Sequence, residues 1–472
     1  MLEGLEISEV HYSKVTLVTE TVRFDPEYFQ QRHLLDSAHV TSAVSSFCSF
    51  RDIGISIDAS AFYPAIEAFY DQGDLPFLRV ADVDSVIDFQ ACTRIPADLC
   101  NRFPTLSKAH PGDIIFTKGG SVARIGLVTE TAAVSRDLIF LNTSKLEEAN
   151  RVFLYIYFQT DFFNRVLLRS SSQTAQPHLT ITLVRELPVF LGSHALKNRC
   201  LHVIQQSFEA RSRAIALQQQ AEQTLLRALG LENWQPPEPL TYTRSSQDTF
   251  AAGRLDAEYF SPRVAQLLNR LNKDGLTIGD AAPARHERFM ASRAGSFDYI
   301  EISGVRQDGT AVSETVSHIE APSRATWFVK TGDVITSTVR PIRRLSALIA
   351  PEQNDFVCSS GFLVLQPKAI PPEVLLTYLR LPPFCELMDL HTSASLYPAI
   401  SEQDLLNLPI PRIERDTQQT IVSAVQSAQV SRRRAAELLN AAKRAVEIAI
   451  ESGEAAAVEF LNAATKGGFA SI

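Results

Sequence analysis

The sequence lacks the features that mark membrane, secreted and disulfide-stabilised proteins. Its 472 residues contain no apolar run of about 18 residues that could cross a bilayer. Residues Met1–Glu6 have neither the basic start nor the apolar stretch of a signal peptide. The six cysteines include no C-x-x-C pair and are too few for a disulfide framework in a chain of this length. We therefore expect a cytoplasmic protein without a membrane partner, whose cysteines are small buried residues.

Motifs for catalysis and cofactor binding are also missing. The sequence contains no G-x-G-x-x-G fingerprint, no Walker A loop, no nucleophile elbow and no His, Cys, Asp or Glu group with metal-ligand spacing. Residues Leu381–Phe384 resemble the loop that holds the target amine in some methyltransferases, but they lack its polar first residue and indicate a structural turn. The glycines within Lys118–Ser121 are not followed by the helix that an anion-binding loop uses. We expect no catalytic residue, no metal and no cofactor.

The chain has no excess of positive charge either. Its 45 Lys and Arg residues against 53 Asp and Glu residues give a net charge of −8. Phosphate contacts are made by Lys and Arg, so this balance disfavours a nucleic-acid partner. A binding face needs only a local excess of positive charge, however, which a net charge does not reveal. The hydrophobic content of 45% is sufficient for two sizeable cores.

What the sequence does contain is a duplication. Three short motifs occur twice in the same order: Asp25–Phe29 and Asp256–Phe260, Pro111–Ile115 and Thr331–Ile335, and Leu187–Val189 and Leu408–Ile410. Each returns after roughly 220 to 230 residues. A period of this length indicates two whole domains, because solenoid repeats are about 20 to 50 residues long. A protein with two similar halves suits a target that also has two halves.

Each half has the pattern of a mixed α/β domain. A helix-like run follows the first motif, over 28–35 and 259–271, and strand-like segments follow at 77–83 and 299–305. The Gly-Asp motif then leads into a strand, a basic loop and a second strand. This order is typical of a β-hairpin that carries charge at its tip.

Each half closes with a long helix that carries an apolar stripe. The second stripe keeps a 4-3-4-3 spacing interrupted only at Arg432: Ile421, Val425, Ala428, Ala435, Leu439, Ala442, Val446 and Ala449. The first stripe is interrupted at Arg211, Gln218 and Glu222: Leu201, Ile204, Phe208, Ile215, Leu225 and Leu229. Helices about 45 to 55 Å long cannot be covered by one globular half, so we expect the two to pack on each other as an antiparallel coiled coil. We interpret Arg211 and Arg432 as solvent-facing or register-marking residues, and the proline cluster of 234–239 as the end of the first helix.

Together these features resemble the specificity subunit of type I restriction-modification enzymes. The resemblance covers residues 20–450 and rests on the duplicated motifs, on a Ser/Thr-rich stretch with a proline in each half, at 170–177 and 392–398, and on the long helices. It implies that each globular half is a target recognition domain that reads one half of a split DNA sequence, and that the helices set the spacing. It also implies two methyltransferase subunits that use S-adenosylmethionine, and two ATP-driven restriction subunits in the full complex.

The expected fold is therefore mixed α/β, with two similar globular target recognition domains joined by two long helices packed as an antiparallel coiled coil. The expected parts are a first target recognition domain at 1–195, a central spacer helix at 196–233, a linker and second target recognition domain at 234–411, a C-terminal spacer helix at 412–450 and a tail at 451–472. The alternative is a protein-interaction scaffold that kept this architecture without reading DNA, which the acidic net charge favours. A stand-alone methyltransferase ranks third because the cofactor loop is missing.

Candidate DNA-binding residues lie at the two hairpin tips. Cationic side chains there can bind phosphates, and an arginine fork can grip a guanine edge. These candidates are Lys118, Ser121 and Arg124 in the first half and Arg340, Arg343 and Arg344 in the second. Weaker candidates lie in the Ser/Thr-rich stretches: Gln173, Gln176, His178, Ser393, Ser395 and Tyr397. A solvated loop would carry similar residues, and only their duplication at equivalent positions favours DNA.

Overall fold

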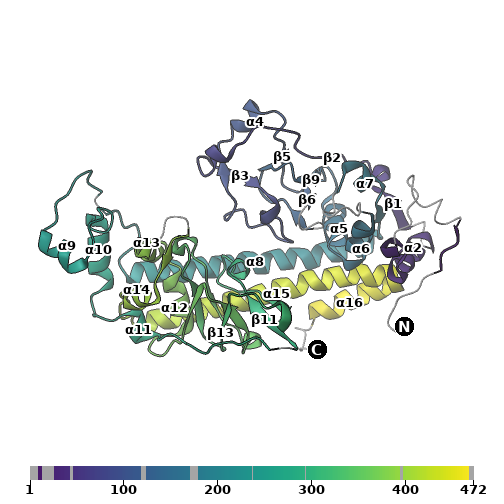
Figure 1. Cartoon of the computed structure of the whole chain (residues 1–472). Coiled ribbons are helices and arrows are strands. Elements are labelled where there is room, and N and C mark those ends of the chain that lie inside the picture. The colour runs from purple at the N-terminus through teal and green to yellow at the C-terminus, as the bar shows by residue number, and fades with distance from the viewer. Residues whose placement is uncertain are drawn as a thin grey trace. The chain divides into compact units, whose positions relative to one another are not determined.

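The protein is described here by a computed structural model (Figure 1), which covers residues 9–12, 26–42, 46–118, 124–170, 179–236, 238–292, 294–393 and 397–466. The chain divides into two compact units. Unit 1 consists of residues 1–209 and 434–472, and unit 2 consists of residues 210–433. The border falls inside both long helices, so each unit contains one globular part and a segment of each helix.

The globular part of unit 1 is mixed α/β. Its helices are η1 (Pro26–Phe29), α2 (Gln31–Ser42), α3 (Phe50–Ile53), η3 (Glu67–Phe69), η4 (Val80–Asp82), α4 (Leu99–Arg102), α5 (Glu148–Phe158), α6 (Asp161–Ser170) and α7 (Ile181–Glu186). Its strands are β1 (Phe47–Ser49), β2 (Ile57–Asp58), β3 (Leu75–Leu78), β4 (Arg94–Ile95), β5 (Lys108–Ala109), β6 (Ile114–Thr117), β7 (Ile125–Leu127), β8 (Ala132–Val134), β9 (Leu138–Leu141) and β10 (Pro188–Phe190). They form sheets in the orders β2-β9-β6-β7 and β4-β3-β8-β5, and the pair β1-β10.

The globular part of unit 2 repeats this plan. Its helices are α9 (Ser246–Ala252), α10 (Pro262–Leu271), α11 (Ile278–Ala281), η5 (Ile302–Gly304), η6 (His318–Glu320), η7 (Pro341–Arg343), η8 (Pro351–Gln353), α12 (Pro372–Leu379), α13 (Pro382–Leu390) and α14 (Glu402–Asn407). Its strands are β11 (Ser296–Ile300), β12 (Glu314–Ser317), β13 (Ala325–Phe328), β14 (Val334–Ser337), β15 (Ser346–Leu348), β16 (Val357–Ser359), β17 (Phe362–Leu365), β18 (Thr392–Ser393) and β19 (Ala399–Ile400). The sheets run β15-β14-β17 and β12-β11-β16-β13, with the pair β18-β19.

Equivalent strands pair in the same way in both units. Strand β6 pairs antiparallel with β7 and β9, as β14 does with β15 and β17. The pair β3-β8 is parallel, and so is the pair β11-β16. The Tyr157 hydroxyl donates to the carbonyl oxygen of Pro188 at 2.7 Å, and Tyr378 donates to Pro409 at the same distance. These matched contacts confirm that the repeated motifs belong to two domains of one fold.

The central strand of each unit carries the Gly-Asp motif and is buried along its whole length. All four residues of β6 are buried, as are all four of β14. A helix covers each strand, α5 in unit 1 and α12 in unit 2, and is itself buried on most of its surface. The clusters around them also contain residues of the long helices, such as Ile204 and Val446 in unit 1 and Leu225 and Val425 in unit 2. The sheet, the covering helix and the long helices of a unit therefore share one core.

The two long helices, α8 (His194–Ala228) and α15 (Arg415–Ser452), pack antiparallel, and the short α16 (Glu454–Lys466) follows α15. In unit 1 the backbone N–H of Ser193 donates to the Glu454 carboxylate at 2.8 Å, and the Ser207 hydroxyl donates to the carbonyl oxygen of Ala435 at 2.7 Å. The residue numbers of the two partners thus change in opposite directions. Every residue of the stripe predicted for α15 is buried, so the predicted coiled-coil seam is confirmed on that helix.

The stripe predicted for α8 is wrong at one position and incomplete at others. Ile215 is 48% exposed, whereas Ala214, Ala221 and Ser207 are buried. Ile204, Leu225 and Leu229 of the predicted stripe are buried as expected, and small residues occupy the buried positions between Ile204 and Leu225. Hydrophobicity alone favoured the larger Ile215 next to Ala214, and this is why the sequence interpretation chose the wrong residue.

Two further expectations about the helices are corrected. Helix α8 ends at Ala228, before the proline cluster, because Gly230 adopts a left-handed conformation with φ of 66° and the Leu231 N–H closes the end on the carbonyl oxygen of Leu226 at 2.8 Å. The side chain of Arg432 is only 18% exposed and lies 3.3 Å from the Asp308 carboxylate. A guanidinium can be buried where a carboxylate faces it, so Arg432 is a paired residue of the interior of unit 2 and does not face solvent.

Candidate nucleic-acid interface

Each hairpin of interest starts at a Gly-Asp turn whose geometry the sequence dictates. Gly112 and Gly332 have φ of 96° and 84°, a region that strongly favours glycine. The following aspartate accepts the backbone N–H two residues before the glycine. His110 donates to Asp113 at 2.7 Å, and the equivalent lysine of unit 2 donates to Asp333 at 2.9 Å. The turn therefore sets the start of β6 and β14 in the same way.

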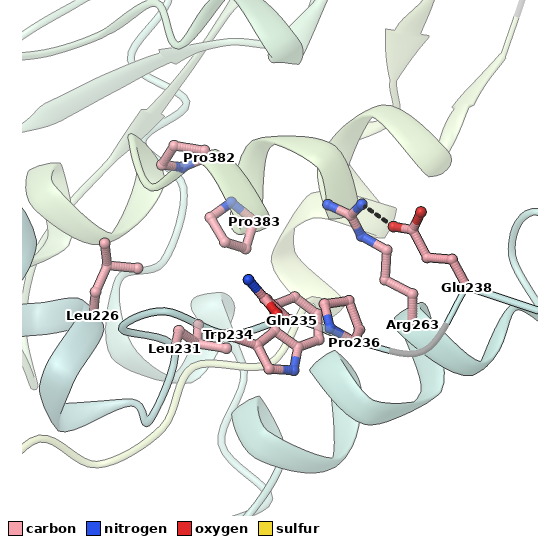
Figure 2. A pocket seen from close by; sticks show the side chains of 9 residues that line it. All are labelled: Leu226, Leu231, Trp234, Gln235, Pro236, Glu238, Arg263, Pro382 and Pro383. Atoms are coloured by element: carbon pink, nitrogen blue, oxygen red, sulfur yellow. Dashed lines mark hydrogen bonds and ion pairs between the residues drawn. The ribbon is translucent and has the colours of Figure 1, made fainter.

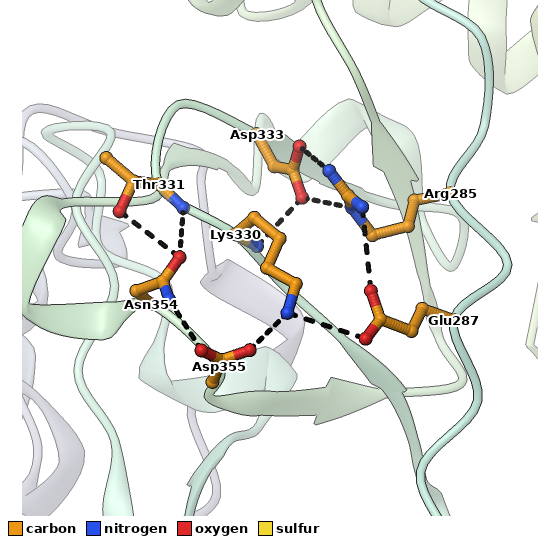
Figure 3. A network of polar contacts seen from close by, with 7 residues as sticks. All are labelled: Arg285, Glu287, Lys330, Thr331, Asp333, Asn354 and Asp355. Atoms are coloured by element: carbon orange, nitrogen blue, oxygen red, sulfur yellow. Dashed lines mark hydrogen bonds and ion pairs between the residues drawn. The ribbon is translucent and has the colours of Figure 1, made fainter.

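The two aspartates differ in their charge environment. In unit 2 the Arg285 guanidinium donates to both oxygens of Asp333, at 2.7 and 3.1 Å, within a network that also contains Lys330, Glu287 and Asp355 (Figure 3). In unit 1, Asp113 is fully buried, and burial raises the pKa of its carboxyl above the usual range despite the N–H bond from the backbone. The same motif thus carries a paired carboxylate in one unit and a desolvated one in the other.

The basic side chains at the tip of the second hairpin, residues 338–345, differ in their exposure to solvent. The short helix η7 lies between Arg340 and Arg344, which both adopt left-handed backbone conformations with φ of 50° and 60°. Arg343 is exposed, and Ile342 beside it is 50% exposed. The side chain of Arg344 instead points inward and forms a 2.8 Å ion pair with Glu222 of α8. Adjacent arginines therefore have different surroundings.

The second hairpin tip and the Ser/Thr-rich stretch of unit 2 lie together. The Arg340 guanidinium lies 5.5 Å from the centre of the Tyr397 ring, and its backbone N–H donates to the carbonyl oxygen of Pro398 at 2.8 Å. Tyr397 is 68% exposed and Ser393 is exposed on β18. The structure thus brings Arg340, Arg343, Ser393 and Tyr397 to one edge of unit 2, although more than forty residues separate the two segments in sequence.

The first hairpin shares one backbone contact with the second. The Leu179 N–H donates to the carbonyl oxygen of Lys118 at 3.0 Å, as the Ile400 N–H does to that of Thr338 in unit 2. The Lys118 ammonium donates to the carbonyl oxygen of Arg136 at 2.9 Å, and burial lowers its pKa. Arg124 is exposed. Five candidates lie outside the described residues: Ser121, Gln173, Gln176, His178 and Ser395.

Sequence reasoning missed the residues that support the tip of unit 2. Arg380, which follows α12, is 3% exposed and donates to the carbonyl oxygens of Arg344, at 2.8 Å, and of Ser346, at 3.2 Å. In the sequence, Glu222 stands out only as an interruption of the apolar stripe of α8. A single arginine in an otherwise apolar stretch, and a carboxylate on an apolar stripe, are signals that could have indicated a buried ionic contact.

Other features of unit 2 have structural explanations. Leu381–Phe384 forms the start of α13, with prolines in the first turn and Phe384 buried, which supports the reading as a structural turn. A cavity of about 460 Å³ is lined mainly by apolar and proline side chains, including Trp234 and Pro383 (Figure 2). Its two charged lining residues, Arg263 and Glu238, pair with each other at 2.9 Å, so this cavity offers no unpaired charge to a ligand.

The described part of the chain offers neither a metal site nor a membrane-spanning helix. None of its groups of His, Cys, Asp and Glu side chains could hold a metal ion. Among its helices, none combines the length and the apolar composition needed to cross a bilayer. The cysteines are all free; Cys92, Cys200, Cys358 and Cys385 are buried, as expected from the sequence, whereas Cys48 and Cys100 are only half-buried.

Comparison with known proteins gives matches only among solved structures. No protein-family model and no curated protein matches the chain. A type I restriction-modification S subunit from M. genitalium matches with 11% identity and a TM-score of 0.34, over 88% of this chain and 95% of that one. The type IIG restriction endonuclease BpuSI matches with 9% identity and a TM-score of 0.31, over 37% of this chain and 28% of that one. The HsdS subunit from Thermoanaerobacter tengcongensis matches with 15% identity and a TM-score of 0.26, over 90% and 94%. The first and third of these are specificity subunits, the family that the sequence resembles.

Proposed function

We propose that the chain is the DNA sequence-specificity subunit of a type I restriction-modification complex. Each unit would read one half of a bipartite site through its hairpin tip and the adjoining Ser/Thr-rich stretch. The long helices would set the distance between the two half-sites. In this proposal the chain has no active site of its own and acts in the cytoplasm, where it directs two methyltransferase subunits, and two restriction subunits in the full complex, to one sequence.

The observation that carries this proposal is the repeated junction of two sequence-distant loops. In both units a residue that follows the Ser/Thr-rich stretch donates its backbone N–H to the hairpin, Leu179 to Lys118 and Ile400 to Thr338. In unit 2 this junction presents Arg340 and Arg343 beside the exposed ring of Tyr397. Cations for phosphates next to polar and aromatic groups for base edges are the combination that DNA readout requires.

Salt-dependent binding of duplex DNA tests the proposal. The full chain is titrated with random-sequence duplexes at several salt concentrations, alone and together with a type I methyltransferase subunit. We expect the logarithm of the binding constant to fall linearly with the logarithm of salt concentration. When the methyltransferase subunit is present, we expect selection of a two-part sequence. Absence of salt-dependent binding under both conditions would refute the proposal.

The same titration addresses the interaction scaffold. The acidic net charge of −8 favours that candidate, since a DNA-binding protein gains from general positive charge. A scaffold would bind the methyltransferase subunit without any gain in DNA affinity. A readout subunit would increase the selectivity of the methyltransferase for one sequence, so the two functions give different results in one experiment.

A further inference from the structure

The tip of the second hairpin rests on a buried arginine. The Arg380 side chain donates to the carbonyl oxygens of Arg344, Ser346 and Gln307. Burial, and then the neighbouring Arg344, lower the pKa of Arg380 to about 10, so the guanidinium is still charged at neutral pH. A buried charge is costly unless it is paired and hydrogen-bonded. Here its hydrogen bonds hold the C-terminal side of the tip, where the chain enters β15, and join it to the segment that contains Gln307.

Arg344 forms the reciprocal contact. Its Nε donates to the carbonyl oxygen of Arg380 at 2.6 Å, and its Nη2 donates to Glu222 at 2.8 Å. The two guanidinium groups repel each other, and Glu222 is the carboxylate bonded to this pair. Its side chain is 22% exposed and that of Arg344 is 29% exposed. The charge of Glu222 therefore stabilises a contact between helix α8 and the tip, within unit 2.

The backbone of the tip needs such support. Arg340 and Arg344 both have positive φ, a left-handed conformation that is unfavourable for residues other than glycine. The Gln307 side chain adds a bond to the carbonyl oxygen of Arg343 at 3.2 Å. Together these contacts hold η7 in a conformation that leaves Arg343 exposed while Arg344 is turned inward.

We propose that Glu222 is a positioning residue for DNA recognition by unit 2. Through Arg344 it holds the tip so that Arg343 can meet the DNA. This inference rests on the proposed function, and it gives α8 a second role besides its coiled-coil seam. Glu222 does not itself touch DNA, because its carboxylate is used in the ion pair.

A double-mutant cycle between Glu222 and Arg343 tests the proposal. Removal of a carboxylate by itself should strengthen DNA binding slightly, because it removes a negative charge. We expect the opposite for Glu222→Ala, namely weaker DNA binding. The dissociation constant should rise by a factor of about 2 to 160, the range that interaction energies between contacting residues correspond to. In the Arg343→Ala background the same change should cause no further weakening, since the contact that Glu222 positions is already lost and only the slight gain from the removed negative charge remains.

The matched control is Glu232→Ala, which removes the same charge from the exposed pair with Arg227 and should leave affinity unchanged or slightly higher. Glu222→Gln, which keeps a hydrogen-bond acceptor, provides a second variant if Glu222→Ala folds poorly. Additive effects in the cycle, or full affinity in both Glu222 variants, would overturn the positioning role. Weaker DNA binding by Arg343→Ala would in that case still support the proposed function. A wild-type chain that binds no DNA would instead overturn the proposed function itself.

Discussion

Arg343 and Arg344 are neighbours with the same side chain, but their surroundings differ, and the structure predicts different effects for their replacement by alanine. Arg343→Ala should leave the folding of unit 2 intact and weaken DNA binding. Arg344→Ala should destabilise unit 2, because the ion pair with Glu222 and the hydrogen bond to the carbonyl oxygen of Arg380 are lost. Arg344→Ala should also weaken DNA binding, because Arg344 links Glu222 to the tip, so the loss of stability is what distinguishes the two variants.

The expected magnitudes follow from these contacts. Hydrogen bonds that involve a charged group contribute about 1.5 to 3 kcal/mol each, but Arg344 is 29% exposed and solvent screens part of this energy. Its removal also relieves repulsion with Arg380. We therefore expect Arg344→Ala to lower the free energy of unfolding by about 1 to 3 kcal/mol. An exposed residue such as Arg343 should change it by less than about 0.5 kcal/mol.

Tryptophan fluorescence makes the stability measurement specific for unit 2. The chain contains two tryptophans, Trp234 and Trp327, and both belong to that unit. Urea unfolding followed by this signal gives the stability of each variant, and DNA titrations at several salt concentrations give the salt slope. If Arg343 binds a phosphate, its removal should reduce the slope by about 0.9. Equal stability loss in both variants, or an unchanged affinity and slope for Arg343→Ala, would refute this assignment.

Three further predictions concern the turn, the pH dependence and the spacer. Asp333→Asn should lower the free energy of unfolding by about 1.5 to 3 kcal/mol, because its ion pair with Arg285 is lost. Asp113→Asn should leave thermal stability at pH 7 unchanged or higher, because burial raises the pKa of Asp113 and penalises its charged form. Losses of the same size in both variants would contradict this contrast. Burial, and then Arg254, lower the pKa of His391, so the stabilising contribution of its neutral form is full above the ordinary value of 6.5 and is lost as pH falls. Unfolding at pH 7.5 and 5.5, followed by tryptophan fluorescence, should show a smaller loss for His391→Gln than for the wild type, and equal losses would exclude this group. Insertion of four residues after Gln220 adds about 6 Å to α8, so methylation-site mapping should find the gap between half-sites one or two base pairs longer; an active complex with an unchanged gap would show that the helix does not set the spacing.

The site itself was only partly predictable from the sequence. Duplication pointed to both hairpin tips, and in unit 2 the tip does adjoin the Ser/Thr-rich stretch, where Arg340 meets Tyr397. That these two segments lie together could not be read from a sequence in which they are distant, because no local pattern encodes the contact. The different surroundings of Arg343 and Arg344 were equally hidden. They depend on Glu222 and Arg380, which reach the tip only through the tertiary fold.

The sequence by itself determined the features that follow from local periodicity and from repetition. The mixed α/β composition, the Gly-Asp turns that require glycine and the seam of α15 depend on residues close together in the chain. The two equivalent domains follow from the repeated motifs. Tertiary structure decided which residues of α8 form the seam, with Ala214 buried and Ile215 exposed, since the partner helix selects small residues for close approach. It also decided which charges are buried. A guanidinium such as that of Arg432 or Arg380 can leave water only where acceptors from distant segments surround it, and those segments meet only in the folded unit.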